Sequence, residues 1–247
     1  MRILVISLPG DEARRGAIAA RLGELGLDFS FFDAIDGRDG LAPDLEPLVD
    51  RAALDAFWRP LTDAEIACSL THAFACRKVA EDLREPTIIL EDDALVGEDF
   101  ARLARSGLLE RTGHELVLLY HNNTRVVKWP KTRLFGGYTL RVPLKAPWGA
   151  VAYYVSPAGA ATIAARSLPI TGVADWGFDI LEMRTSCIVP RIVEHPPIDP
   201  SQTTMPERDF DIKMPDKKRR TVWQKALDPK YRRYFFRKLR AEWIYKP

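Results

Sequence analysis

Three consecutive carboxylates, Glu91, Asp92 and Asp93, follow directly after the apolar run Thr87 to Leu90. Apolar and β-branched residues between Pro86 and this charged triplet predict a short strand buried on both faces, as in a parallel sheet. Open α/β sheets bind ligands just beyond the carboxyl ends of such strands. We therefore expect the chemistry of this protein at residues 91–93.

If the extended conformation continues past Leu90, Glu91 and Asp93 point to one side and Asp92 to the other. Two carboxylates about 4 Å apart repel by roughly 4 kcal/mol at an effective dielectric constant of 20. The arrangement therefore needs water, a shifted pKa or a cation, and Mg²⁺ or Mn²⁺ would leave coordination positions for phosphate oxygens. The alternative is that Asp92 or Asp93 caps a following helix, Val96 to about Arg105.

The chain has 247 residues, 47% hydrophobic and 28% charged, which is typical of a globular protein with one substantial core. The apolar run at Arg2 to Leu8 is too short for a signal peptide and predicts a first buried strand. Without any apolar stretch near 20 residues, we expect a cytoplasmic protein. The three cysteines, Cys68, Cys76 and Cys187, lack zinc-ligand spacing and predict reduced, mostly buried thiols.

Charge is distributed unevenly along the chain. Residues 213–247 carry 13 Lys and Arg against 3 Asp and Glu, so this tail has a net charge of +10 and the rest of the chain −8. Aromatic residues are interleaved with these cations, which suits a helix lying on an anionic membrane. Nucleic acid is a weaker option because no zinc-finger or RNA-recognition signature is present. Alternatively, Tyr231, Phe235, Leu239 and Trp243 pack a C-terminal helix onto the body.

Strands and helices alternate along the rest of the chain. A strand at 3–8, a helix at 11–25 and a strand at 29–35 are followed by an irregular insertion at 37–60. Thr62 and Glu65 form a capping box for a helix to about Leu83, and Ser156 and Pro157 begin another helix. Further strands are expected at 115–120 and 151–155, with a less regular stretch at 121–147. The predicted fold is α/β, with a mainly parallel central sheet in three layers over 1–212 and the helical tail at 213–247.

Three segments resemble motifs of glycosyltransferase family 25, which includes lipooligosaccharide galactosyltransferases and collagen-modifying relatives. Leu61 to His72 is similar to L-T-x-G-E-I-G-C-x-L-S-H, with Ala64, Ala67 and Thr71 as departures. Ile88 to Ala94 resembles I-L-E-D-D-V, and Gly149 to Ala160 resembles G-x-x-A-Y-x-x-S-x-x-G-A. Val173 to Trp176 matches a later acidic site, and Ile6-Ser7-Leu8 with the following arginines matches I-N-L and an Arg. The resemblance covers roughly residues 1–195.

This resemblance implies a GT-A fold that binds a UDP-sugar, with an acidic site holding Mn²⁺ or Mg²⁺ on the diphosphate. Asp93 would ligate the metal directly, while Glu91 and Asp92 would contact ribose, metal-bound water or metal. The family is inverting, so a carboxylate should deprotonate the acceptor hydroxyl, and Asp175 is the expected base. The alternative for Asp175 is a cap, with Asp179, of a helix through Met183.

The remaining candidate residues would complete the donor site. His72 would contact the diphosphate or orient a carboxylate, and His195 would be a third metal ligand. Ser7 lies on the first strand, and Arg14 or Arg15 is expected to contact the nucleotide.

The leading hypothesis is a metal-dependent galactosyltransferase that acts on a glycolipid or polysaccharide at the inner face of a membrane. One alternative is a metal-dependent nucleotidyltransferase, although no glycine-rich, lysine-containing phosphate loop is visible. Another is a non-catalytic domain that binds membrane or nucleic acid through its tail. The sequence leaves the oligomeric state open.

Overall fold

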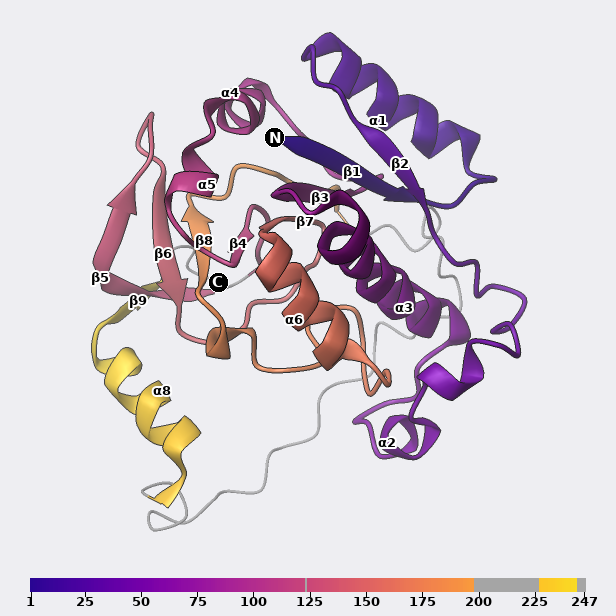
Figure 1. The fold of residues 1–247 in the computed structure, drawn as a ribbon. Coiled ribbons are helices and arrows are strands. Elements are labelled where there is room, and N and C mark those ends of the chain that lie inside the picture. Colours follow the sequence, from indigo (N-terminus) through magenta and orange to yellow (C-terminus); the bar gives the residue numbers. More distant parts are fainter. Residues whose placement is uncertain (123, 198–226, 244–247) are drawn as a thin grey trace.

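The computed structural model describes residues 1–122, 124–197 and 227–243. They form three layers, in which helices cover both faces of one central sheet (Figure 1). The nine strands of this sheet run in the order β2-β1-β3-β7-β4-β8-β6-β5-β9. Their bounds are β1 Arg2–Ser7, β2 Ser30–Asp33, β3 Thr87–Glu91, β4 Leu116–Leu118, β5 Arg125–Arg133, β6 Thr139–Pro143, β7 Ala152–Val155, β8 Thr185–Val189 and β9 Ala241–Trp243.

The expectation of a mainly parallel sheet is wrong, because the sheet is mixed. The pairs β1–β2, β1–β3 and β4–β8 are parallel. The pairs β3–β7, β4–β7, β5–β6, β5–β9 and β6–β8 are antiparallel. Two features make it mixed: β7 runs antiparallel between β3 and β4, and β5 and β6 form a hairpin in the stretch expected to be less regular. Residues 125–133 lack a regular alternation of polar and apolar side chains and contain Pro130, so their strand signal is weak.

Two helical layers enclose the sheet. On one face lie α1 (Glu12–Glu24), α4 (Glu98–Ser106) and α5 (Leu108–Arg111), whose Leu22, Phe100 and Leu109 are fully buried. On the other face, α3 (Asp63–Lys78) and α6 (Pro157–Ser167) pack against each other and against the strands. The insertion at 37–60 contains η1 (Glu46–Leu48) and α2 (Arg51–Asp55), and η3 (Ile180–Glu182) precedes β8.

The predicted helix starts of α3 and α6 are confirmed. The Thr62 hydroxyl accepts from the Glu65 backbone N–H at 3.2 Å, and the Glu65 carboxylate accepts from the Thr62 N–H, so the capping box is complete. Helix α3 continues as the π-helical turn η2 (Val79–Leu83), which agrees with the expected end near Leu83. Ser156 caps α6 through the Gly159 N–H, with Pro157 in the first turn.

The basic tail joins the body at the edge of the sheet. Helix α8 (Pro229–Leu239) leads into β9, which pairs with β5, and the rest of the expected tail lies outside the described residues. Trp243 therefore belongs to a strand and not to the expected helical face. Phe235 and Leu239 are 46% and 69% exposed, which contradicts their packing on the body, whereas Tyr231 is half-buried and Trp243 lies against Arg125 of β5. Within the described ranges, no helix is long and apolar enough to cross a membrane.

Candidate functional site

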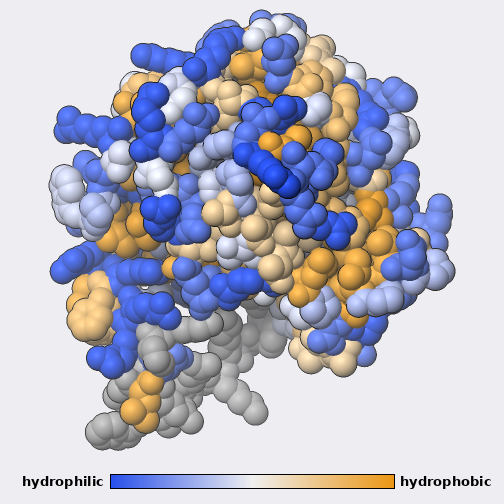
Figure 2. All heavy atoms as spheres, viewed as in Figure 1, coloured by the Kyte–Doolittle hydropathy of each residue, from blue (hydrophilic) through white to orange (hydrophobic). Residues whose placement is uncertain are grey.

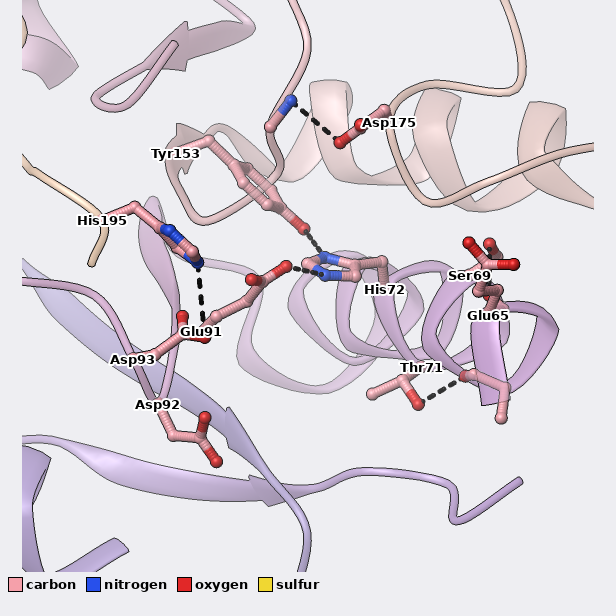
Figure 3. A network of polar contacts seen from close by, with 12 residues as sticks. Glu65, Ser69, Thr71, His72, Glu91, Asp92, Asp93, Tyr153, Asp175 and His195 are labelled. Carbon is pink, nitrogen blue, oxygen red and sulfur yellow. Dashed lines mark hydrogen bonds and ion pairs between the residues drawn. The ribbon is translucent and has the colours of Figure 1, made fainter. Parts of the chain in front are cut away.

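The acidic triplet lies where β3 ends, beside the carboxyl end of β1 and the start of β7. Strand β3 includes Glu91, and the chain turns at Asp92 and Asp93, so the extended conformation stops one residue into the triplet. The cap alternative is wrong, because α4 begins only at Glu98 and its N-cap residue Gly97 supplies no side-chain bond. The three carboxylates instead have different partners, and Figure 3 shows those of Glu91 and Asp93.

Asp92 is held from β1 and α1. The Ser7 hydroxyl donates to Asp92 Oδ2 at 2.6 Å, and Arg14 Nη1 donates to Asp92 Oδ1 at 2.9 Å. Ser7 is 2% exposed, so its hydroxyl is occupied in positioning Asp92. The Arg14 guanidinium also reaches Asp93 Oδ2 at 3.3 Å and therefore bridges two members of the triplet.

Asp93 lies beside His195, although 101 residues separate them in the chain. His195 Nε2 is 3.4 Å from Asp93 Oδ2. A bridge between Leu95 and Glu194 holds the two segments side by side. The other oxygen, Asp93 Oδ1, is buried and has no hydrogen-bond partner within the described part of the chain. A buried carboxylate oxygen of this kind needs a ligand, because leaving it unsatisfied is costly.

Glu91 faces α3 and is held by a buried histidine. His72 Nε2 lies 3.1 Å from Glu91 Oε1, and His72 Nδ1 lies 3.1 Å from the Tyr153 hydroxyl on β7. His72 is 6% exposed and Tyr153 is 1% exposed. Of the two roles considered for His72, the geometry favours orienting a carboxylate over contacting the diphosphate.

The electrostatics differ among the three acids. Burial raises the pKa of Glu91, opposed by the hydrogen bond from His72. Burial also raises the pKa of Asp92, against the bonds from Ser7 and Arg14. Burial acts in the same direction on Asp93, but the hydrogen bond from His195 and the charges of His195 and Arg14 outweigh it and lower that pKa. Asp93 is therefore the triplet member that stays ionised most easily.

Asp175 approaches the same site from the loop before η3. Its Oδ1 accepts the Gly149 backbone N–H at 2.9 Å, and its negative charge contributes to the raised pKa of Glu91. The cap alternative for Asp175 is wrong, because Asp179 alone caps η3 through the Leu181 N–H. Gly149 has a φ of +100°, and a Cβ there would lie 2.5 Å from the Tyr120 ring, so a larger residue would disturb this contact.

Arg15 is separated from the acidic triplet. Its guanidinium pairs with Asp33 at the end of β2 and lies 4.5 Å from the centre of the Phe31 ring. Ser7 and Asp33 are paired in the register of β1 and β2, so Arg15 remains at the same edge of the sheet.

The sequence reasoning missed Tyr153 as a site residue. It lies in the Gly149 to Ala160 segment already singled out, and the antiparallel pairing of β3 with β7 places it opposite Ile89, two residues before Glu91. The motif therefore contained Tyr153, but its contact with His72 depends on the pairing of β3 with β7, which the sequence does not show.

Asp93 and His195 lie close enough to share a divalent cation, and Glu91, whose Oε1 contacts His72, would have to turn toward them to complete the ligand set. Carboxylate oxygens and an imidazole suit Mn²⁺ and, for the oxygens, Mg²⁺. The buried Asp93 Oδ1 fits such an ion, and the adjacent Arg14 guanidinium offers a second positive group to a phosphate. The arrangement can bind a diphosphate and keep a separate carboxylate, Asp175, beside it.

Comparison with known proteins adds a family assignment. The model of "Glycosyltransferase family 25 (LPS biosynthesis protein)" matches residues 1–175. A "Glycosyltransferase 25 family member" of Aedes aegypti is 30% identical over 64% of this chain and 27% of its own length. The "Lacto-N-neotetraose biosynthesis glycosyltransferase LgtE" of Neisseria meningitidis is 34% identical over 38% of this chain and 33% of its own.

The matched regions thus span only about a third or less of these relatives. A solved structure, named as a mannose-1-phosphate geranyltransferase from Thermus thermophilus, aligns over 76% of this chain and 72% of its own at 13% identity. Its TM-score of 0.36 is too low to carry an argument about fold or function.

Proposed function

The chain belongs to glycosyltransferase family 25, and from this premise we propose that it transfers a sugar from a UDP-sugar to a hydroxyl group of a glycolipid or polysaccharide. The observation that carries the proposal is the buried Asp93 Oδ1 beside His195 and Arg14, at the carboxyl end of a central strand. We assign the fold to the GT-A type, supported by the parallel β2-β1-β3 unit that ends at this site. Galactose is the donor sugar we propose.

Asp93, Glu91 and His195 would hold Mn²⁺ or Mg²⁺ when the donor diphosphate binds. The ion would act as a Lewis acid that neutralises charge developing on the departing UDP. Arg14 would contribute positive charge to the same phosphates, while Ser7 holds Asp92 in place. Arg15, with Asp33 and Phe31, would contact the nucleoside farther along the same edge.

Asp175 would act as the general base of an inverting, single displacement. It would take the proton of the acceptor hydroxyl as that oxygen bonds to the anomeric carbon and the bond from this carbon to UDP breaks. The Gly149 N–H fixes the orientation of the carboxylate by binding Oδ1. A separate base is needed because Asp92 and Asp93 are already engaged by cationic groups.

A membrane-bound acceptor is supported by a surface that we call the basic aromatic face, made of β5, β9 and residues 227–240, which include α8. It carries six of the eight exposed large hydrophobic residues of the described chain: Trp129, Leu227, Phe235, Phe236, Leu239 and Trp243. The same segments carry exposed cations: Lys128, Arg133, Arg232, Arg233, Lys238 and Arg240. Figure 2 shows apolar and strongly hydrophilic side chains side by side around α8. This combination fits the interface of an anionic bilayer.

Donor binding tests the proposal directly. UDP-galactose, UDP-glucose and UDP-N-acetylglucosamine would be titrated into the full chain by calorimetry, with Mn²⁺ and then with chelator. We expect Mn²⁺-dependent binding of at least one donor, strongest for UDP-galactose, and UDP release that accelerates with acceptor. If none of the three donors binds, the proposed function is wrong.

A further inference from the structure

A second set of metal-binding atoms lies on the α3 side of Glu91. Cys68, His72 and Glu91 each offer one ligand atom, and these atoms all lie within 4.8 Å of one another. Ligand atoms around a tetrahedral zinc ion lie roughly 3.5 Å apart, given bonds of about 2.0–2.3 Å. Side-chain adjustments of about 1 Å would therefore close the three atoms around one ion.

The backbone favours this grouping. Cys68 and His72 are four residues apart on α3, so their side chains lie on the same face of one helix. Glu91 reaches them from β3, with His72 Nε2 already 3.1 Å from its Oε1. That separation is close to the spacing of two ligands on a single ion.

The surroundings of His72 resemble those of a metal ligand. Its other ring nitrogen, Nδ1, contacts the Tyr153 hydroxyl at 3.1 Å. Histidine ligands normally have such an outer partner, which fixes the ring orientation and leaves the opposite nitrogen for the metal. Tyr153 is in turn buried and 3.7 Å from Cys76 Sγ, so its hydroxyl has little freedom to move.

We propose that Cys68, His72 and Glu91 form a second divalent-metal site, selective for Zn²⁺ over Mg²⁺ and Mn²⁺. A thiolate and an imidazole favour a borderline-soft ion, whereas the Asp93, His195 and Glu91 set is dominated by hard oxygen donors. On binding, Cys68 loses its thiol proton to solvent and its sulfur donates an electron pair to the ion, while His72 takes the tautomer that frees Nε2 for the ion and donates Nδ1–H to the Tyr153 hydroxyl.

Glu91 belongs to both sets, so the two sites compete for it. Zn²⁺ at the Cys68 site would draw Glu91 away from the metal ion that holds the donor diphosphate and would inhibit sugar transfer. This regulatory consequence rests on the proposed function, whereas the metal site itself does not.

Cobalt(II) spectroscopy on the full chain tests the site without any activity measurement. Co²⁺ replaces Zn²⁺ and gives a thiolate-to-metal charge-transfer absorption only when a cysteine is a ligand. We expect this band to saturate at one equivalent of Co²⁺, to disappear when Zn²⁺ is added, and to be lost in Cys68→Ser. Cys187→Ala is the matched control and should retain it, because Cys187 is fully buried on β8 and outside this cluster.

Circular dichroism would verify that each variant folds, and Cys68→Ala provides a second substitution. His72→Ala should weaken Co²⁺ binding by about tenfold or more. Absence of a thiolate band in the wild-type chain, or its persistence in folded Cys68→Ser, would overturn the site. Donor binding by calorimetry is a separate measurement, so a chain that binds Co²⁺ through Cys68 and binds no UDP-sugar would keep the site and reject the proposed function.

Discussion

The imidazole of His72 connects Tyr153 to Glu91, with 3.1 Å at each of its two nitrogens. These contacts link Tyr153 on β7, His72 on α3 and Glu91 on β3. Tyr153 and His72 are almost inaccessible to solvent. Burial makes each of these polar contacts expensive to lose. The position of Glu91 thus depends on a hydroxyl group that belongs to another strand.

Tyr153→Phe tests this dependence. The substitution keeps the ring, which packs edge-on against Trp176 at 5.4 Å, and removes only the hydroxyl. We expect transfer to fall by about 10–100-fold, as is typical when an outer partner of a site residue is lost. The matched control is Tyr154→Phe, on the opposite face of β7, which should leave kcat and KM unchanged. Equal activity of the two variants would reject this role.

Asp93→Asn tests the donor site. The amide is nearly isosteric but lacks the charge that pairs with His195 and Arg14. We expect Mn²⁺-dependent binding of a UDP-sugar, measured by calorimetry, to weaken by about 100-fold or more. Asp28→Asn, at an exposed position, is the control and should bind normally. Full affinity in Asp93→Asn would show that this residue does not ligate the metal.

Asp175→Asn separates binding from chemistry. The amide oxygen can still accept the Gly149 N–H, so the loop should keep its conformation. Donor binding should persist, while kcat for transfer should fall by about 10²–10⁴-fold because the base is lost. Asp179→Asn, which changes only the cap of η3, should transfer at a nearly normal rate. If Asp175→Asn retained kcat, another group would have to be the base.

The basic aromatic face predicts salt-sensitive membrane binding. Replacing Arg232 and Arg233 by Glu should weaken the affinity for vesicles containing anionic phospholipid by about tenfold or more, measured by co-sedimentation. The reason is that each cation near the membrane surface contributes about 1 kcal/mol. Raising the ionic strength should weaken wild-type binding in the same direction. Arg77→Glu, at an exposed position of α3 outside this face, is the control and should bind vesicles normally. If the double substitution left vesicle binding unchanged, this face would not be the membrane-binding surface.

His114 predicts a contribution to acid sensitivity. Burial, with a smaller effect from the Arg184 charge, lowers its pKa below the ordinary 6.5. The unfolded chain then binds more protons than the folded one as the pH falls below about 6.5, so the free energy of unfolding decreases there. Urea unfolding at pH 7.5 and 5.5 should show a smaller decrease in His114→Gln than in the wild type. An identical decrease in both proteins would contradict the assignment.

Local sequence patterns determined the elements of the site. The apolar run before Glu91 predicts β3, the Thr62 and Glu65 capping box predicts the start of α3, and Ser156 with Pro157 predicts α6. Each depends on residues within one turn or one strand, where propensity and capping bonds operate. The family resemblance added Asp175 as a candidate, because the order of motifs can be read directly along the sequence.

The tertiary structure decided which of these residues meet. It places His195 against Asp93, selects Arg14 over Arg15 for the triplet, and connects Cys68, His72 and Glu91. It also makes the sheet mixed, because β7 inserts antiparallel between β3 and β4 and because β5 and β6 pair as a hairpin. These outcomes depend on strand order and register between distant segments, and no local periodicity encodes them. The sequence by itself therefore determined the acids and their strand, while the packing of strands and helices around them decided the partner of each acid.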